Sequence, residues 1–266
     1  MSSDWSSDVC SSDLDTLPAD TDPRIITKGT STLQQDFALL LSRDGRVELR
    51  LDNLAGDGLF LNGSDSVGLD SWHHYVATYD GSTARIYVDG ALRGTRSKAV
   101  SLGANANPVW IGGQPTVSTA RPFDGSIDDV RVYTGALSPA DVQSLYEDAD
   151  VPVGPDPSCD DQVQNQGEQG VDCGGPCAQD CAGEDPSPAT LEHYWPLDGD
   201  GSDIQGSWEG TLHGPVQGSG ASAAALFFDG TDDYVDAGTG SMTGETFSVS
   251  AWFALHPDAT TDADKR

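Results

Sequence analysis

The chain alternates short apolar-containing segments with Asp-, Gly- and Ser-rich turns, a pattern typical of β-strands joined by tight turns. Two pairs of segments flank Asp-Gly turns and predict β-hairpins: Phe37–Ser42 with Val47–Asp52, and Trp72–Tyr79 with Ala84–Val88. Further predicted strands are Val109–Ile111, Ile127–Tyr133, Tyr194–Leu197, Ala223–Phe228, Tyr234–Val235 and Phe247–Phe253. The chain is therefore predicted to be all-β, an antiparallel β-sandwich.

One helix is predicted, at 138–146. Ser138 is a suitable N-cap, Pro139 fits the first helical position, and Asp141 stands where the acidic residue of a capping box belongs. Val142 and Leu145 then fall on one face of the helix at helical spacing. We expect this short terminal helix to close the sandwich.

The amino-acid composition excludes some classes of function. The formal net charge is −30, and 36 of the 43 acidic residues are Asp, which favours turns over helix interiors. A polyanion would be repelled, so no nucleic acid is expected as a partner. The apolar runs are far shorter than the roughly 20 residues of a membrane span, so none is predicted in this chain. Dense Asp in loops also supplies oxygen ligands for calcium, although a solvated acidic surface would have the same composition.

The sequence divides into four parts. Residues 1–14 repeat Ser-Ser-Asp, and Asp8–Leu14 resembles a translated sequencing adapter, so we expect an artefact there. Residues 15–148 carry the first group of strands. Residues 149–190 have a linker composition rich in Pro, Gly and Asp, and residues 191–266 return to strand-like patterns.

Several motifs resemble those of bacterial laminin-G-like, concanavalin A-like jelly-roll domains. In the first part they are Trp72–Gly90, Phe123–Tyr133 and Gly135–Tyr146, which are similar to the central hairpin, last strand and terminal helix of that family. In the last part they are His193–Asp198, Gly210–Gly214, Phe227–Val235 and Phe247–Phe253, which are similar to its opening third. The first part lacks that third and the last part has little else, so the chain is interpreted as a fragment of tandem domains. Because the family's first and last strands are neighbours, 191–266 is able to complete 15–148 as a circular permutant.

Four cysteines form a separate module at 159–181: Cys159, Cys173, Cys177 and Cys181. A short segment with almost no apolar residues cannot fold around a hydrophobic core and needs covalent cross-links. Two disulfides are therefore expected, with three possible pairings. Zinc is the alternative, but Cys159 stands alone rather than in a Cys-x2–4-Cys pair. Disulfides would place the protein outside the cytosol.

The family resemblance also implies a calcium site where the loop before the last strand meets the loop after an early strand. The matching residues are Asp124, Asp128, Asp229 and Asp233. Asp residues that merely cap turns beside Gly125 and Gly230 would look the same in the sequence.

No catalytic residues are predicted. The paired-carboxylate strand of glucan hydrolases is missing, and no Ser/His/Asp arrangement is evident. The function expected is an extracellular or cell-surface bacterial module that binds a glycan or a cell-surface protein with the help of calcium. A structural spacer of a large surface protein and an accessory domain of a secreted glycoside hydrolase are the alternatives. Only Trp208, in a Gly-rich segment, looks free to stack on a sugar, and the ligand-binding residues are unknown.

Overall fold

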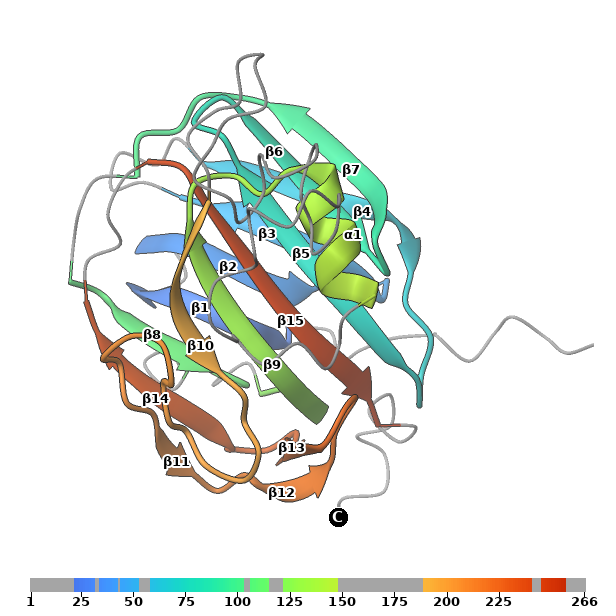
Figure 1. Cartoon of the computed structure of the whole chain (residues 1–266), viewed down its shortest axis with the longest axis vertical. Coiled ribbons are helices and arrows are strands. Elements are labelled where there is room, and N and C mark those ends of the chain that lie inside the picture. The colour runs from blue at the N-terminus through green and yellow to red at the C-terminus, as the bar shows by residue number, and fades with distance from the viewer. Residues whose placement is uncertain are drawn as a thin grey trace, which may run out of the picture.

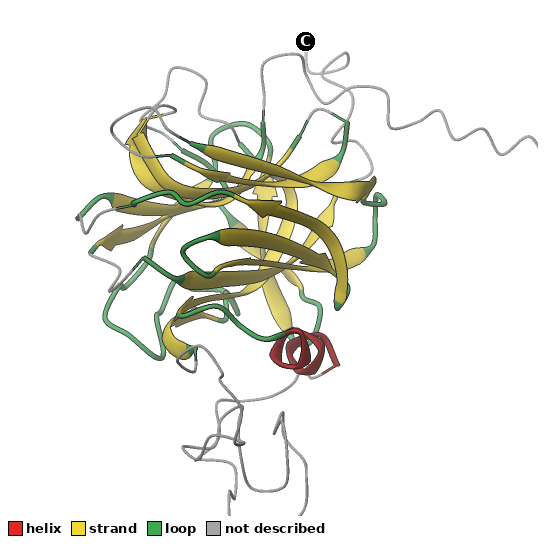
Figure 2. Ribbon diagram, turned by 90° about the horizontal axis from the view of Figure 1, so that it is seen from above, coloured by secondary structure: helices red, strands yellow, loops and turns green. Residues whose placement is uncertain are grey.

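The computed structural model describes residues 22–31, 34–42, 44–52, 58–102, 106–114, 122–147, 189–240 and 245–256. These residues form two antiparallel sheets packed face to face, with one helix on the outside (Figures 1 and 2). The predicted antiparallel β-sandwich with a single short helix is confirmed for this part of the chain.

One sheet has seven strands, in the order β11-β14-β8-β1-β2-β3-β4. In that order they are β11 (Thr211–His213), β14 (Tyr234–Thr239), β8 (Pro108–Ile111), β1 (Arg24–Ser31), β2 (Gln34–Leu41), β3 (Arg46–Leu51) and β4 (Leu59–Ser66).

The other sheet has eight strands, in the order β12-β13-β9-β15-β5-β6-β7, and β10 also pairs with β9. They are β12 (Val216–Ser219), β13 (Ala224–Asp229), β9 (Asp124–Thr134), β15 (Phe247–Leu255), β5 (Trp72–Tyr79), β6 (Thr83–Val88), β7 (Ala91–Ser97) and β10 (Thr190–Trp195).

Strands from the two ends of the described chain interleave in both sheets. β15 lies between β5 and β9, with Val249 opposite both Ala77 and Val132. In Figure 1 the red β15 runs between the green β9 and the teal β5. β13 and β10 also pair with β9, and β14 pairs with β8. The segment after the linker therefore supplies the centre of one sheet and the end of the other.

A single apolar core fills the space between the sheets. Alternating residues point inward, as the two-residue period of a strand requires, and these side chains are fully buried. Both parts of the chain contribute: Leu39 and Ile86 come from before the linker, whereas Trp195, Phe228 and Phe253 come from after it. Removing either part would expose the apolar face of the other.

The helix α1 (Pro139–Glu147) covers the outer face of the eight-stranded sheet. The Ser138 amide donates to the Asp141 carboxylate at 2.8 Å, and the Asp141 amide donates to Ser138 Oγ at 3.2 Å. This reciprocal pair is the capping box that the sequence predicts. Val142 is fully buried and packs in a small second cluster with Val76 and Tyr87.

Several strands, among them β1, β4 and β12, are not anticipated by the sequence pattern. Gly29 interrupts β1, and β4 contains Asn62 and Gly63, residues that usually mark turns. Their neighbours in the sheet override these weak propensities.

The four cysteines at 159–181 and the segment 1–14 lie outside the described residues. Among the described residues, no helix is both long and apolar enough to cross a membrane.

Candidate functional site

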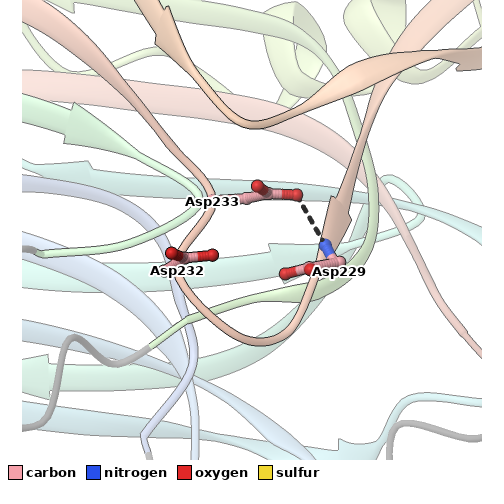
Figure 3. A group of neighbouring side chains, drawn as sticks. All are labelled: Asp229, Asp232 and Asp233. Atoms are coloured by element: carbon pink, nitrogen blue, oxygen red, sulfur yellow. Dashed lines mark hydrogen bonds between the residues drawn. The ribbon is translucent and has the colours of Figure 1, made fainter.

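Acidic side chains gather at one end of the sandwich, around the loop that joins β13 to β14. The carboxylates of Asp229, Asp232 and Asp233 offer oxygen atoms that all lie within 4.8 Å of one another (Figure 3). Asp229 is the last residue of β13 and stands opposite Asp124, the first residue of β9. The strand register therefore brings together the two loops from which the sequence predicts a metal site.

Hydrogen bonds within the loop hold the carboxylates in position. The Asp229 amide donates to Asp233 Oδ2 at 2.9 Å, and the Thr231 amide donates to Asp229 Oδ1 at 2.8 Å. Gly230 has φ +72°, and a Cβ there would approach the Asp124 carboxylate oxygen to 2.8 Å. Glycine at this position thus permits both the turn and the close approach of Asp124.

A second glycine makes room for Asp233. Gly214 has φ +95°, and a Cβ built on it would lie 1.8 Å from Asp233 Oδ1. Burial raises the pKa of Asp233, the negative charges of Asp229 and Asp232 raise it further, and the Asp229 amide partly offsets both. The loop thus holds like charges together at a cost that a bound cation would relieve.

Asp128 is not among these converging carboxylates. It lies one strand segment along β9, is almost fully buried, and accepts a hydrogen bond from the Ala221 amide at 2.9 Å. Burial, followed by the charges of Asp129 and Asp198, raises the pKa of Asp128 to about 7. Asp232, which the sequence analysis did not single out, takes a place in the acidic group. The run Asp229-Gly-Thr-Asp-Asp233 was the available signal, because a tight turn brings its ends together.

Trp208 is not a free aromatic side chain. Its ring stacks on His193 with 3.7 Å between ring centroids, and it packs against the main core. Asp203 organises this region: its carboxylate accepts hydrogen bonds from His193 Nδ1 at 2.6 Å and from the Tyr194 and Trp208 amides at 3.0 Å each. The only tryptophan that the sequence left available for stacking on a sugar therefore supports the fold instead.

Three polar side chains at the start of β5 form a hydrogen-bonded chain that the sequence analysis missed. Ser71 Oγ lies 3.0 Å from His73 Nε2, and His73 Nδ1 lies 2.9 Å from Asp89 Oδ2. Asp89 Oδ1 accepts from the His74 amide at 2.9 Å. The β5–β6 hairpin brings Asp89 next to the start of β5, although 16 residues separate it from His73.

His73 and His74 point to opposite sides of the sheet, as adjacent strand residues must. His73 packs near Phe253 on the core side, whereas His74 is stacked between Trp252 and Tyr146 beneath α1. Burial and the nearby Arg131 lower the pKa of His74 to about 3, so its imidazole is neutral at physiological pH. The two imidazoles do not converge on one point.

The family comparison indicates a class of protein. Residues 14–143 match the family model Laminin_G_3, described as the concanavalin A-like lectin/glucanases superfamily. Domains of this kind are generally non-catalytic modules that bind carbohydrates or other ligands. Comparisons with curated proteins and with solved structures gave no match.

Proposed function

We propose that this protein is an extracellular binding module that holds calcium at the Asp229–Asp233 loop and uses that end of the sandwich to contact a glycan or a cell-surface protein. The observation that carries the proposal is the convergence of Asp229, Asp232 and Asp233 within 4.8 Å, with Asp124 directly across the strand pair. The general behaviour of the superfamily supports the ligand class.

Calcium suits this loop better than a transition metal would. The three converging groups are all carboxylates, and neither imidazole nor thiolate is among them. Hard oxygen donors favour calcium, which takes six to eight oxygen ligands, including backbone carbonyls and water. Asp124 and Asp229 would join the two loops through the ion, and Asp128 would remain outside this set.

An extracellular, bacterial cell-surface location rests on the cysteine module and on the family resemblance. Four cysteines within 159–181 fit two disulfides, which persist only in oxidising compartments. The strongly acidic composition is compatible with that location.

We also propose that the described sandwich is a circularly permuted jelly roll, in which 191–266 provides the opening strands that 15–148 lacks. The pairing of β15 with both β5 and β9 supports this arrangement. A linker of about 40 residues is ample, because an extended chain covers about 3.3 Å per residue. The calcium loop then needs both parts of the chain, since Asp124 precedes the linker and Asp229 follows it.

Thermal melting with calcium and with excess chelator tests the site. At a free calcium concentration of about one hundred times Kd, binding adds about 2.7 kcal/mol to the free energy of unfolding. Asp229→Asn combined with Asp233→Asn should remove this gain, while leaving the melting temperature in chelator unchanged or higher, because like charges are neutralised.

Asp65→Asn is the matched control. Asp65 is an exposed carboxylate on β4, at the far edge of the seven-stranded sheet from β14, and its replacement should leave the calcium response intact. An unaltered calcium response in the double variant, or an equal loss in the control, would show that the ion binds elsewhere. No response to calcium in the unaltered protein would refute the calcium proposal.

A further inference from the structure

Hydrogen bonds link Ser71 to His73 and His73 to Asp89. The order of the three side chains and the atoms that are linked are those that nucleophilic serine chemistry requires. Because Asp89 Oδ2 is an acceptor at 2.9 Å, the proton of the neutral imidazole is assigned to His73 Nδ1. His73 Nε2 is then an acceptor, and it lies 3.0 Å from the hydroxyl oxygen of Ser71, whose other contact is a longer one of 3.5 Å to the Leu69 carbonyl oxygen. The base is oriented by a carboxylate, and the nucleophile is within hydrogen-bond reach of the base.

The carboxylate of Asp89 is itself held in place. Its other oxygen accepts from the His74 amide at 2.9 Å, and Asp89 sits in a tight turn with φ +52°. Partial burial tends to raise the pKa of Asp89, but the hydrogen bonds from His73 and from the His74 amide hold it below the ordinary value. Asp89 therefore stays ionised and able to stabilise an imidazolium.

We propose that Ser71, His73 and Asp89 form a nucleophilic triad that accepts small acyl groups from carboxylic esters and passes them to water. This activity goes beyond the binding function proposed above and does not depend on calcium.

The reaction proceeds in two balanced halves. Ser71 Oγ forms a bond to the carbonyl carbon of the ester, its proton moves to His73 Nε2, and the carbonyl electron pair moves onto oxygen. When the carbonyl re-forms, the C–O bond to the alcohol breaks and the alcohol takes the proton from His73. Water then attacks the acyl-Ser71 ester and gives its proton to His73. The carboxylic acid leaves as the proton returns to Ser71.

The surroundings leave the nucleophile accessible. Ser71 is exposed, and the side chain of His73 is 18% exposed. Gly68 stands beside the pair: a Cβ there would lie 3.1 Å from Ser71 Oγ and 3.6 Å from His73 Nε2. The absence of a side chain at Gly68 keeps open the space next to the Ser71–His73 hydrogen bond.

The triad lies at the same end of the eight-stranded sheet as the acidic loop. Leu69 bridges to Leu255 just before Ser71, and Leu255 in turn pairs with Gly125, beside Asp124. Three strand spacings, from β5 through β15 and β9 to β13, separate the two sites by about 14 Å.

Labelling with a fluorophosphonate tests the proposal, because this probe phosphonylates an activated serine as fluoride leaves with the proton. The full chain should be labelled at Ser71, as located by peptide mass spectrometry, and should hydrolyse p-nitrophenyl acetate. Ser71→Ala should abolish labelling. His73→Gln and Asp89→Asn should each slow labelling and hydrolysis, the former by about 100-fold or more, because general-base catalysis contributes about 10²–10⁴-fold.

Two further variants separate reactivity from folding. Ser82→Ala is the matched control: Ser82 is also exposed, but its hydroxyl bonds to the Asp80 carboxylate at 2.8 Å rather than to an imidazole. It should retain full labelling. Gly68→Ala should keep the triad and the melting temperature while reducing labelling by crowding Ser71. The proposal would be overturned if the unaltered protein were not labelled, if other serines were labelled, or if labelling of Ser71 persisted in His73→Gln. Addition of chelator should leave labelling and hydrolysis unchanged.

Discussion

β15 follows the linker but lies between β5 and β9, which precede it. A buried side chain of β15 should therefore stabilise these earlier strands. Phe253 is fully buried and packs edge-on against Phe123, with 6.1 Å between ring centroids. It stands opposite both His73 and Ile127. Truncating a buried Phe to Ala typically costs about 3–5 kcal/mol, through lost burial and the cavity that remains.

For a domain of about 200 residues, each kcal/mol lowers the melting temperature by about 2–4 °C. Phe253→Ala should therefore lower the melting temperature by about 6–20 °C, in one cooperative transition. Val216→Ala serves as the control, since Val216 also follows the linker but is 60% exposed, and its effect should stay within about 0.5 kcal/mol.

Calorimetry combined with hydrogen exchange distinguishes a shared domain from two independent parts. In the variant, amides of β5 and β9 should lose protection together with those of β2 and β3, which lie in the other sheet. A separate transition in which β2, β3 and β5 keep their original stability would refute the inference that the two parts fold as one unit.

Two other residues give independent predictions. Asp128 has a pKa of about 7 in the folded chain, above its unfolded value, so the folded state binds the extra proton and stability falls as pH rises from about 4 to 7. Asp128→Asn should remove this fall and stabilise the protein at pH 8, as measured by urea unfolding across pH; a profile parallel to that of the unaltered chain would contradict the assignment. Ser138→Ala removes the hydroxyl that caps α1 and should cost about 1 kcal/mol, whereas Ser138→Thr should cost less; equal melting temperatures for all three proteins would show that the cap contributes nothing.

The acidic site was predicted from the sequence only in part. Asp229 and Asp233 were predicted from the resemblance of Phe227–Val235 to the family's motif, and the tight turn that they flank brings in Asp232 as well. Asp128 was grouped with Asp124 because both lie in Phe123–Tyr133, the motif that resembles the family's last strand. A bulge in β9 at Asp129, with φ +51°, and burial against the Ala221 loop give Asp128 a separate environment.

The Ser71–His73–Asp89 chain was missed for a different reason. Ser71 and His73 are two residues apart and therefore lie on the same side of an extended segment. Asp89 joins them only because the β5–β6 hairpin pairs Tyr75 with Val88. The hairpin itself was predicted, so its register would have revealed the contact.

By itself, the sequence determined the local elements: the Asp-Gly hairpins, the capped helix and the strands whose apolar residues recur with a period of two. These depend on short-range sterics and on hydrogen bonds between near neighbours, which the order of residues encodes directly. Only the tertiary structure decided that β15 lies between β5 and β9 and that Asp124 faces Asp229 across the strand pair. Such contacts join residues more than one hundred positions apart, and they form because burying the two open apolar faces against each other removes both from water.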